Sequence, residues 1–459
     1  MSIYKPCDIR GPSSEFSPEL YHAWGLSLGL ELPEGSPFVI GGDVRLSTPA
    51  FLNALADGLV ASGMHVVNIG IQPTPIIYFQ KRFLKAPGCA IVTASHHPPA
   101  HNGLKWMIGT LPPTEEDVTR LKESAQSRKL RGRHPGRVVC ISPTEYGSWL
   151  RARFATTSVH TRVRVVLDPG NGCWAAHGQQ YVQNAFPKSC LLSIHSTPDG
   201  LFPNRDPDCA QRENLTRLCE SVLANHSDMG VAFDGDGDRV AFVDNEGTAL
   251  SPEEAAWILI QSFGASFLER KFVHDIKFSD RVGDAVRALG GTPIAERSGH
   301  AFIRTRMIRE TALFGAEISG HYFYDELEGG DDGLFTACRL LEYLGETGLS
   351  LADLRRTCPH VYLTPDIRLQ VFPDPRAFLQ QVRTAFADFP QSYVDGVRVD
   401  FPQGWALVRA SVTEDKVTLR FEGDSEPGLK GVVQLFAERM PEVAGRLETE
   451  SGIRPKNES

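Results

Sequence analysis

The 459-residue sequence lacks several features that mark common protein classes. Its nine cysteines include no CxxC pair, which favours reduced thiols in a cytoplasmic protein. The opening MSIYKPCDIRG lacks the apolar core of a signal peptide, and no apolar run reaches the length needed to span a bilayer. Basic residues are outnumbered by acidic ones: the formal net charge is −9 and the pI about 5.9. We therefore expect a cytoplasmic protein with no nucleic-acid or membrane partner.

What the sequence does contain is an ordinary globular composition, 41% hydrophobic and 22% charged, arranged as an internal repeat. Strand, helix, strand, helix and strand follow one another from Pro37 to Ser95, again from Val163 to Arg239, and again from Phe272 to His321. Strands that alternate with helices predict parallel sheets covered on both faces. Each copy carries its most polar, glycine-rich string after its last strand, where ligands of such sheets bind.

A fourth unit begins near Pro359, where segments 361–371, 396–401, 405–411 and 416–421 alternate as strands and 427–439 predicts a closing helix. The expected fold class is therefore α/β: three related α/β domains with mixed, mainly parallel sheets, plus a C-terminal α+β domain, around a central cleft. The predicted divisions are 1–142, 143–247, 248–358 and 359–459.

The first copy ends in a candidate nucleophile, Ser95, where a buried strand runs into a turn rich in proline. Its neighbours supply proton carriers and a cation: His96, His97, His101 and Lys105. Asn102–Gly103 predicts a second tight turn. A zinc site from the histidines is disfavoured, because no cysteine or carboxylate stands at ligand spacing.

The second copy ends in Asp234, Asp236 and Asp238, which alternate with glycine after an apolar strand. Alternate side chains of an extended segment share a face, so three like charges crowd together unless a cation neutralises them. Three hard oxygens suit Mg²⁺ better than Zn²⁺. An EF-hand loop is excluded, because Arg239 replaces its turn glycine and Asn245 its final glutamate.

Four strings resemble the α-D-phosphohexomutase superfamily, in the family's order. TASHHPPAHNGLK (93–105) is similar to its phosphoserine loop, DGDGDR (234–239) to its metal loop, GAEISGH (315–321) to its sugar loop, and RASVTED (409–415) to its phosphate loop. Cys7, His97, His101, Val412 and Asp415 depart from the family pattern. The sequence is most like the bifunctional phosphomannomutase/phosphoglucomutase branch.

The resemblance implies specific roles for site residues. Ser95 is implied as the phosphoserine, bound with Mg²⁺ to Asp234, Asp236 and Asp238. Glu317, Ser319 and His321 are implied in sugar binding, and Lys277, Arg409, Ser411 and Thr413 in binding the substrate phosphate. Arg10 and His96 support the site, and Lys105, Arg239 and His300 are alternatives for proton transfer.

The expected function is interconversion of hexose 1-phosphate and hexose 6-phosphate, of mannose, glucose or both, through a hexose 1,6-bisphosphate. Glucose 1,6-bisphosphate or mannose 1,6-bisphosphate is the implied activator, hexose phosphates are the partners, and monomer and dimer stay open. The alternatives are a phosphoglucosamine mutase, a metal-dependent phosphatase and a catalytically silent sugar-phosphate sensor.

Overall fold

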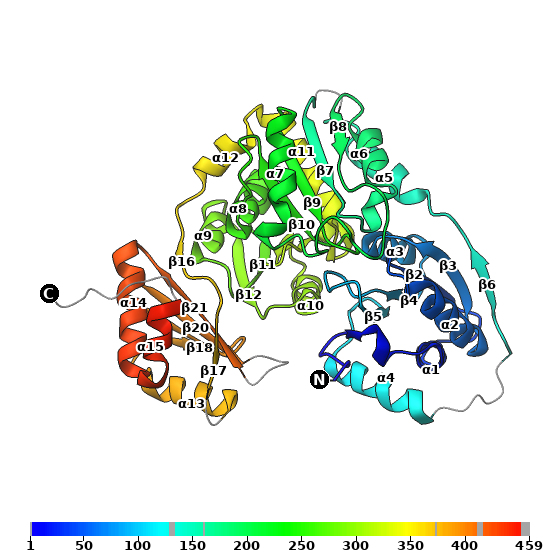
Figure 1. Cartoon of the computed structure of the whole chain (residues 1–459), viewed down its shortest axis with the longest axis horizontal. Coiled ribbons are helices and arrows are strands. Elements are labelled where there is room, and N and C mark those ends of the chain that lie inside the picture. The colour runs from blue at the N-terminus through cyan, green and yellow to red at the C-terminus, as the bar shows by residue number, and fades with distance from the viewer. Residues whose placement is uncertain (1, 128–133, 159–160, 372–373, 411–415, 451–459) are drawn as a thin grey trace.

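The computed structural model describes residues 2–127, 134–158, 161–371, 374–410 and 416–450. Its strands form four separate sheets, and we call the units built on them domains 1 to 4. Figure 1 shows domain 1 (blue to cyan) and domain 4 (orange to red) at opposite ends of the molecule, with domains 2 and 3 between them. No helix among the described residues has both the length and the apolar character needed to cross a bilayer.

Domain 1 is built on a six-stranded mixed sheet in the order β1-β5-β4-β2-β3-β6. Its elements are β1 (Ile9–Pro12), α1 (Pro18–Gly29), β2 (Pro37–Gly42), α2 (Thr48–Ala61), β3 (His65–Ile71), α3 (Thr74–Phe83), β4 (Gly88–Val92), β5 (His101–Ile108), α4 (Glu115–Ser127) and β6 (Arg137–Cys140).

Domain 2 has a four-stranded sheet in the order β10-β9-β7-β8. Its elements are α5 (Glu145–Arg153), β7 (Arg164–Asp168), α6 (Gly178–Ala185), β8 (Cys190–Ser193), α7 (Thr216–Ala224), β9 (Met229–Phe233) and β10 (Val240–Asp244).

Domain 3 has a five-stranded sheet in the order β12-β11-β13-β14-β15. Its elements are α8 (Pro252–Phe263), β11 (Lys271–Asp275), α9 (Asp280–Ala288), β12 (Thr292–Glu296), α10 (His300–Glu310), β13 (Phe314–Ala316), β14 (Tyr322–Tyr324), β15 (Gly330–Asp331), α11 (Gly333–Thr347) and α12 (Leu351–Thr357).

Domain 4 has an antiparallel sheet in the order β16-β21-β20-β19-β18, with β17 also paired to β21. Its elements are β16 (Tyr362–Leu363), β17 (Ile367–Gln370), α13 (Pro375–Ala385), β18 (Gln391–Ser392), β19 (Val397–Phe401), β20 (Gly404–Ala410), β21 (Lys416–Gly423), α14 (Glu426–Arg439) and α15 (Pro441–Glu450).

The repeat predicted from the sequence is confirmed by the strand order of the first three sheets. In each one the first strand of the repeat (β2, β7 or β11) lies between the second and the third and runs parallel to both. The third strand (β4, β9 or β13) then pairs with an antiparallel strand that follows it. The three polar loops therefore occupy the same position in their domains, between the third strand and its antiparallel neighbour.

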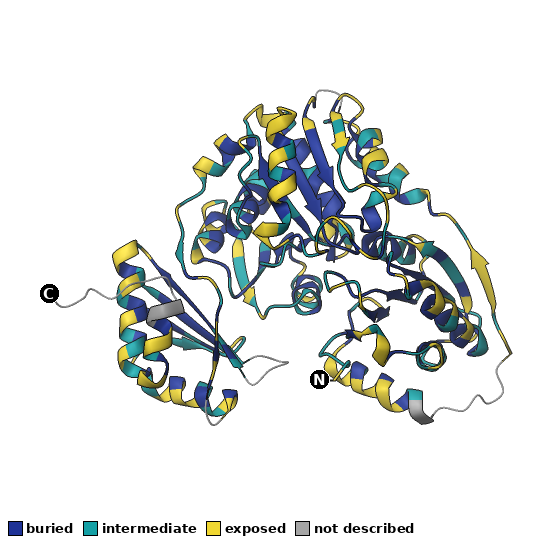
Figure 2. Ribbon diagram, in the orientation of Figure 1, coloured by how far each residue is buried: buried dark blue, intermediate teal, exposed yellow. Residues whose placement is uncertain are grey.

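One apolar core joins domains 1 to 3. Ile91 of β4, Phe233 of β9 and Phe314 of β13 belong to the same cluster of buried side chains, whereas domain 4 has a separate core around Phe421 and Phe436. Figure 2 shows most strands buried (dark blue) beneath helices whose outer faces are exposed (yellow), whereas β6, at the edge of the domain 1 sheet, is exposed. Because close-packed interiors deform little, the loops after β4, β9 and β13 are held in fixed relation to one another.

Two local predictions were wrong. Asn102–Gly103 is not a turn but part of β5, where Gly103 is required by close approach: a Cβ there would lie 2.1 Å from the Ile9 carbonyl oxygen of β1. Segment 361–371 is not one strand but two, β16 and β17, interrupted by Thr364, Pro365 and Asp366. Pro365 has no N–H to donate to a ladder, which explains the break.

Candidate active site

Ser95 lies three residues beyond the end of β4 in an unusual backbone conformation. Its φ is 52°, in the left-handed region that few residues other than glycine adopt. The side chain is buried, and its Oγ donates a hydrogen bond to Asp234 Oδ2 at 3.0 Å. The His96 ring follows, with Nδ1 3.4 Å from Ser95 Oγ. Strain of this kind persists only where surrounding contacts impose it.

Arg45, in the loop after β2, makes the contacts that hold the backbone of Ser95 in this conformation. Its buried guanidinium donates to the carbonyl oxygens of the loop that carries Ser95, namely those of Ser95 (2.9 Å), His97, Pro98 (2.5 Å) and His101 (3.2 Å). Arg45 is held in turn by Asp43, whose Oδ2 accepts from Arg45 Nε at 2.9 Å and from Thr93 Oγ1 at 2.7 Å. The sequence motifs gave neither Arg45 nor Asp43 a role.

Arg45→Lys should therefore lower kcat on the order of 10- to 100-fold, the effect typical of residues that orient others. Lysine keeps the charge but cannot present the planar fork that reaches several carbonyls at once. Steady-state kinetics with a hexose 1-phosphate measure the loss of kcat. The matched control is Arg120→Lys, because Arg120 forms an exposed ion pair with Asp117. A wild-type kcat in Arg45→Lys would show that the clamp is not needed.

The three aspartates after β9 form a buried cluster directly beside Ser95. One carboxylate oxygen of each lies within 4.8 Å of one oxygen of the other two. Lys105 of β5 donates to Asp236 Oδ2 at 2.8 Å and to Asp238 Oδ2 at 2.6 Å, and Thr74 Oγ1 donates to Asp236 Oδ2 at 2.7 Å. Oδ1 of Asp236 is buried without a hydrogen-bond partner. An unpartnered buried oxygen among three clustered carboxylates fits a hard divalent cation.

The charges in this cluster depend on each other. Burial, Asp238 and Asp236 raise the pKa of Asp234 well above its usual value. Burial lowers the pKa of Lys105, but Asp236 and Asp238 outweigh it and raise the pKa well above normal. The ammonium of Lys105 is therefore retained in a buried site, where it offsets part of the negative charge.

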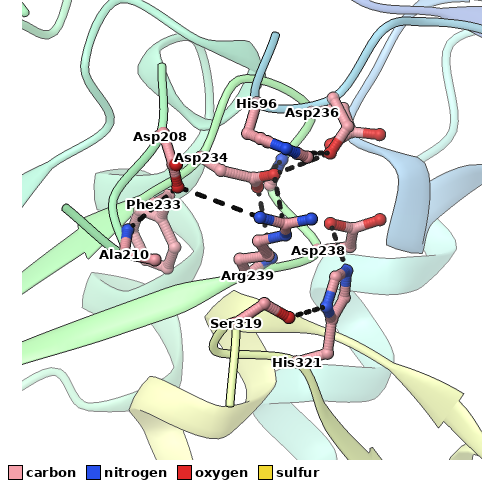
Figure 3. Close-up of polar contacts among 12 residues, drawn as sticks. His96, Asp208, Ala210, Phe233, Asp234, Asp236, Asp238, Arg239, Ser319 and His321 are labelled. Atoms are coloured by element: carbon pink, nitrogen blue, oxygen red, sulfur yellow. Dashed lines mark hydrogen bonds and ion pairs between the residues drawn. The ribbon is translucent and has the colours of Figure 1, made fainter. Parts of the chain in front are cut away.

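Domain 3 reaches the cluster through the loop between β13 and β14. Figure 3 shows His321 between Ser319 and Asp238, and Arg239 between Asp208 and Asp234. His321 Nε2 lies 3.1 Å from Asp238 Oδ1, and its Nδ1 lies 2.9 Å from Ser319 Oγ and 3.3 Å from Glu317 Oε2. Burial lowers the pKa of His321, but Asp238 and Glu317 together outweigh it and raise the pKa to about 10.

His300, at the start of α10, stacks on His321 with ring centroids 5.7 Å apart. Burial, with Lys105 and His321 adding to it, lowers the pKa of His300 to about 3. Of the three alternatives for proton transfer, His300 is thus the one held neutral near pH 7, whereas Lys105 carries its proton. Arg239 Nε lies 3.8 Å from Asp234 Oδ2.

The remaining predicted residues lie outside this cluster of contacts. Arg10 pairs with Asp8 at 2.6 Å and approaches His97 Nδ1 at 3.4 Å. Lys277, after β11, pairs with Asp366 at 3.2 Å, and Arg409, on β20, pairs with Asp395 at 2.6 Å. Ser411 and Thr413 lie outside the described residues. The structure thus brings Ser95, Lys105, the aspartates and the loop between β13 and β14 together, and it places Lys277 and Arg409 in separate ion pairs outside this cluster.

Thr74, Asp43 and Arg45 are site residues that motif spacing did not reveal. Thr74 begins α3 and contacts Asp236 from 162 positions away. A polar residue directly after a strand or at a helix start is the signal that could have found Asp43 and Thr74, whereas Arg45 lies in the middle of the loop between β2 and α2.

The fold and the site define a class: a four-domain α/β protein with a buried serine beside a carboxylate cluster suited to a divalent cation. Sequence models of the four phosphoglucomutase/phosphomannomutase domains match the chain in order. They are alpha/beta/alpha domain I at residues 2–131, alpha/beta/alpha domain II at 145–247, alpha/beta/alpha domain III at 251–362 and the C-terminal domain at 370–439. The chain belongs to the phosphoglucomutase/phosphomannomutase family.

Relatives of similar length support this assignment. A phosphomannomutase/phosphoglucomutase of Pseudomonas aeruginosa is 32% identical over 455 residues, covering 97% of each chain. A protein of Xanthomonas campestris described as phosphohexose mutases is 31% identical, over 97% of this chain and 99% of its own. The crystal structure of a phosphoglucomutase/phosphomannomutase family protein from Burkholderia thailandensis superposes with a TM-score of 0.84 at 27% identity, covering 99% and 98%.

Proposed function

We propose that this protein interconverts hexose 1-phosphates and hexose 6-phosphates of glucose and mannose through a phosphoserine at Ser95 and a hexose 1,6-bisphosphate. The observation that carries the proposal is the hydrogen bond from buried Ser95 Oγ to Asp234, one of three clustered carboxylates that Lys105 partly neutralises. The names of the full-length relatives describe the same activity. Nine cysteines, none in a disulfide, support a cytoplasmic location.

In the first transfer the P–O bond to Ser95 Oγ breaks while a bond forms between phosphorus and the free hydroxyl oxygen of the sugar phosphate. The hydroxyl proton passes to a base, and Ser95 Oγ departs as the leaving oxygen. Mg²⁺ bound by Asp234, Asp236 and Asp238 would neutralise charge on the phosphoryl group. The chain itself positions the reactants: Arg45 and Asp43 hold the Ser95 loop, and Lys105 holds Asp236 and Asp238.

The bisphosphate then turns end over end and returns its other phosphoryl group to Ser95. Its second phosphate requires an anchor away from Ser95, and Lys277 and Arg409, with Ser411 and Thr413, are assigned to that anchor. The divisions 1–142, 143–247, 248–358 and 359–459 then give each domain one loop of the site. Glucose 1,6-bisphosphate or mannose 1,6-bisphosphate would load Ser95 and so act as activator.

The test is a coupled assay with glucose 1-phosphate, Mg²⁺ and a trace of glucose 1,6-bisphosphate, together with mass spectrometry of the intact protein. We expect glucose 6-phosphate as product and a phosphorylated fraction whose phosphate maps to Ser95. Release of inorganic phosphate in place of sugar 6-phosphate would identify a phosphatase. Sugar-phosphate binding with neither product would identify a sensor.

The sugar loop predicts the specificity among hexoses. Glu317 is buried and pairs with His321, whose Nδ1 lies 3.3 Å from Glu317 Oε2; the carboxylate keeps further lone pairs that can accept from a substrate hydroxyl. By resemblance Glu317 and Ser319 read the 3- and 4-hydroxyls, which glucose and mannose share. We expect kcat/KM for glucose 1-phosphate and mannose 1-phosphate to agree within about tenfold. Galactose inverts carbon 4, so kcat/KM for galactose 1-phosphate should be lower by a factor on the order of a thousand, because the inverted 4-hydroxyl no longer reaches the Glu317 carboxylate.

Glu317→Gln provides the direct check, because it should lower activity on glucose 1-phosphate and narrow the gap to galactose 1-phosphate. Glu310→Gln is the matched control: it removes a carboxylate at the end of α10 that pairs with Lys271. Equal turnover of galactose and glucose 1-phosphates by the wild-type protein would disprove this role of Glu317. Glucosamine 1-phosphate differs from glucose 1-phosphate at carbon 2, so the same assay measures the phosphoglucosamine alternative.

A further inference from the structure

Arg409, the cation of domain 4 assigned to the substrate phosphate, already has a carboxylate partner. Asp395 Oδ2 accepts from Arg409 Nε and also lies 2.6 Å from Arg409 Nη2. Both side chains are largely shielded, with 18% of Arg409 and 20% of Asp395 exposed. The sequence analysis gave Asp395 no role, and nothing in the proposed mechanism uses it.

The local fold fixes Asp395 opposite Arg409. Asp395 and Gly396 form the turn before β19, and the first residue of β19, Val397, pairs with Val408, the neighbour of Arg409 on β20. Gly396 has φ 80°, and a Cβ there would lie 2.1 Å from the Val408 carbonyl oxygen, so the turn packs directly against β20. A turn held this closely presents the carboxylate to one edge of the guanidinium and restricts its rotation.

The same carboxylate also reaches domain 3. Asp395 Oδ2 accepts from the Ser298 backbone N–H at 3.4 Å, and Ser298 Oγ donates to Asp275 Oδ1 at 2.6 Å. Asp275 Oδ1 also accepts from the backbone N–H of Lys277 at 3.0 Å. A continuous series of hydrogen bonds therefore joins the backbone N–H of Lys277 to the side chain of Arg409.

From this geometry we propose that Asp395 is the positioning residue of the substrate-phosphate site. It holds the Arg409 guanidinium in one orientation and, through Ser298, sets its distance from Lys277 across the boundary between domains 3 and 4. An arginine already ordered loses less side-chain entropy when a phosphate binds. The inference rests on the proposed function, because it takes Arg409 as a phosphate ligand.

In the opposite role Asp395 would compete with the substrate: its carboxylate would occupy the position of the substrate phosphate beside Arg409, and the phosphate would displace it. The two roles predict opposite signs. A positioning residue makes substrate binding weaker when its charge is removed, whereas removal of a competitor makes binding tighter. The fixed turn and the double contact with Nε and Nη2 favour positioning, because a displaceable partner would not need such support.

The first experiment is steady-state kinetics of full-length Asp395→Asn with glucose 1-phosphate. We expect KM to rise about tenfold with kcat within about twofold of wild type, because Arg409 binds a phosphate that takes no part in the bond exchange. A merely structural defect would reduce the active fraction, and so lower kcat at constant KM. Asp388→Asn is the matched control: it removes an Asp–Arg pair with Arg439 in the same domain and should change neither constant.

A double-mutant cycle tests whether the effect passes through Arg409. In an Arg409→Ala background, Asp395→Asn should add little to KM, because the group it positions is gone. An undiminished tenfold effect in that background would overturn the inference. So would an unchanged or lowered KM in the single variant, and a lowered KM would identify Asp395 as a competitor.

A binding arm separates this inference from the proposed function. Calorimetry with glucose 6-phosphate on Ser95→Ala and on Ser95→Ala/Asp395→Asn requires no turnover. We expect Kd to rise about tenfold in the double variant, in line with KM. If the wild-type protein shows no mutase activity but Kd rises in the double variant, the proposed function fails and the role of Asp395 stands. If mutase activity is present and Kd is unchanged, only the inference about Asp395 fails.

Discussion

Replacing Ser95 with alanine is expected to reduce mutase turnover on the order of 10⁴-fold or more, the scale seen when a nucleophile is removed. In the proposed mechanism Ser95 Oγ carries the phosphoryl group between the two half-reactions, and alanine has no atom to replace it. The carboxylate beside it, Asp234 at 3.0 Å, cannot take over, because it is committed to the cluster with Asp236 and Asp238. The coupled assay, with glucose 1,6-bisphosphate present, measures the loss.

The fold of the Ser95→Ala variant should survive. The side chain contributes one hydrogen bond and little packing, so the free energy of unfolding should change by about 1 kcal/mol. Ser148→Ala, an exposed serine on α5, is the matched control and should keep full activity. Normal turnover in Ser95→Ala, with phosphate found on another residue, would refute the assignment of the nucleophile.

Asp236→Asn should reduce turnover at least about a hundredfold, while glucose 6-phosphate still binds. The substitution preserves shape but removes one of three carboxylate charges and turns one carboxylate oxygen into an NH2 donor, so the hydrogen bonds from Lys105 and Thr74 are left with a neutral acceptor. The remaining pair of carboxylates, Asp234 and Asp238, offers a divalent cation fewer charged oxygens. Sugar phosphate should bind almost normally, because its contacts are assigned to domains 3 and 4.

Removal of the metal by a chelator tests the same role of the cation without a substitution. Excess chelator should abolish wild-type activity and added Mg²⁺ should restore it, whereas Asp236→Asn should recover little at any Mg²⁺ concentration. Asp353→Asn, an exposed aspartate on α12, should behave as the wild-type protein does. Full activity of the wild-type protein in chelator would exclude a role for a metal in the transfer.

Local patterns in the sequence were sufficient to predict the fold class. A run such as Cys89–Val92 followed by a glycine- or proline-rich polar string marks the end of a buried strand, and the pattern occurs three times. That periodicity is a property of neighbouring residues, so it is readable without knowledge of distant contacts. The same strings placed Ser95, Asp234 and Glu317 after the third strand of each repeat, as the structure has them. Their chemical roles stay predictions for the experiments above.

Turn signals were less informative, because the same residues serve other purposes. Asn102–Gly103 has the composition of a hairpin turn, yet the glycine lies inside β5 where β1 approaches too closely for a side chain. A local pattern cannot distinguish a glycine required by backbone conformation from one required by packing. Only the position of the neighbouring strand decides between them.

Charge pairing within the site was decided entirely by tertiary structure. Lys105 meets Asp236 across 131 positions, Thr74 meets the same carboxylate across 162, and Arg45 reaches the carbonyl of Ser95 across 50. Such contacts depend on strand order, on the shared core that fixes three loops together, and on buried charges that must find partners. The sequence by itself therefore determined which residues stand at strand ends; which of them touch followed from how the domains pack.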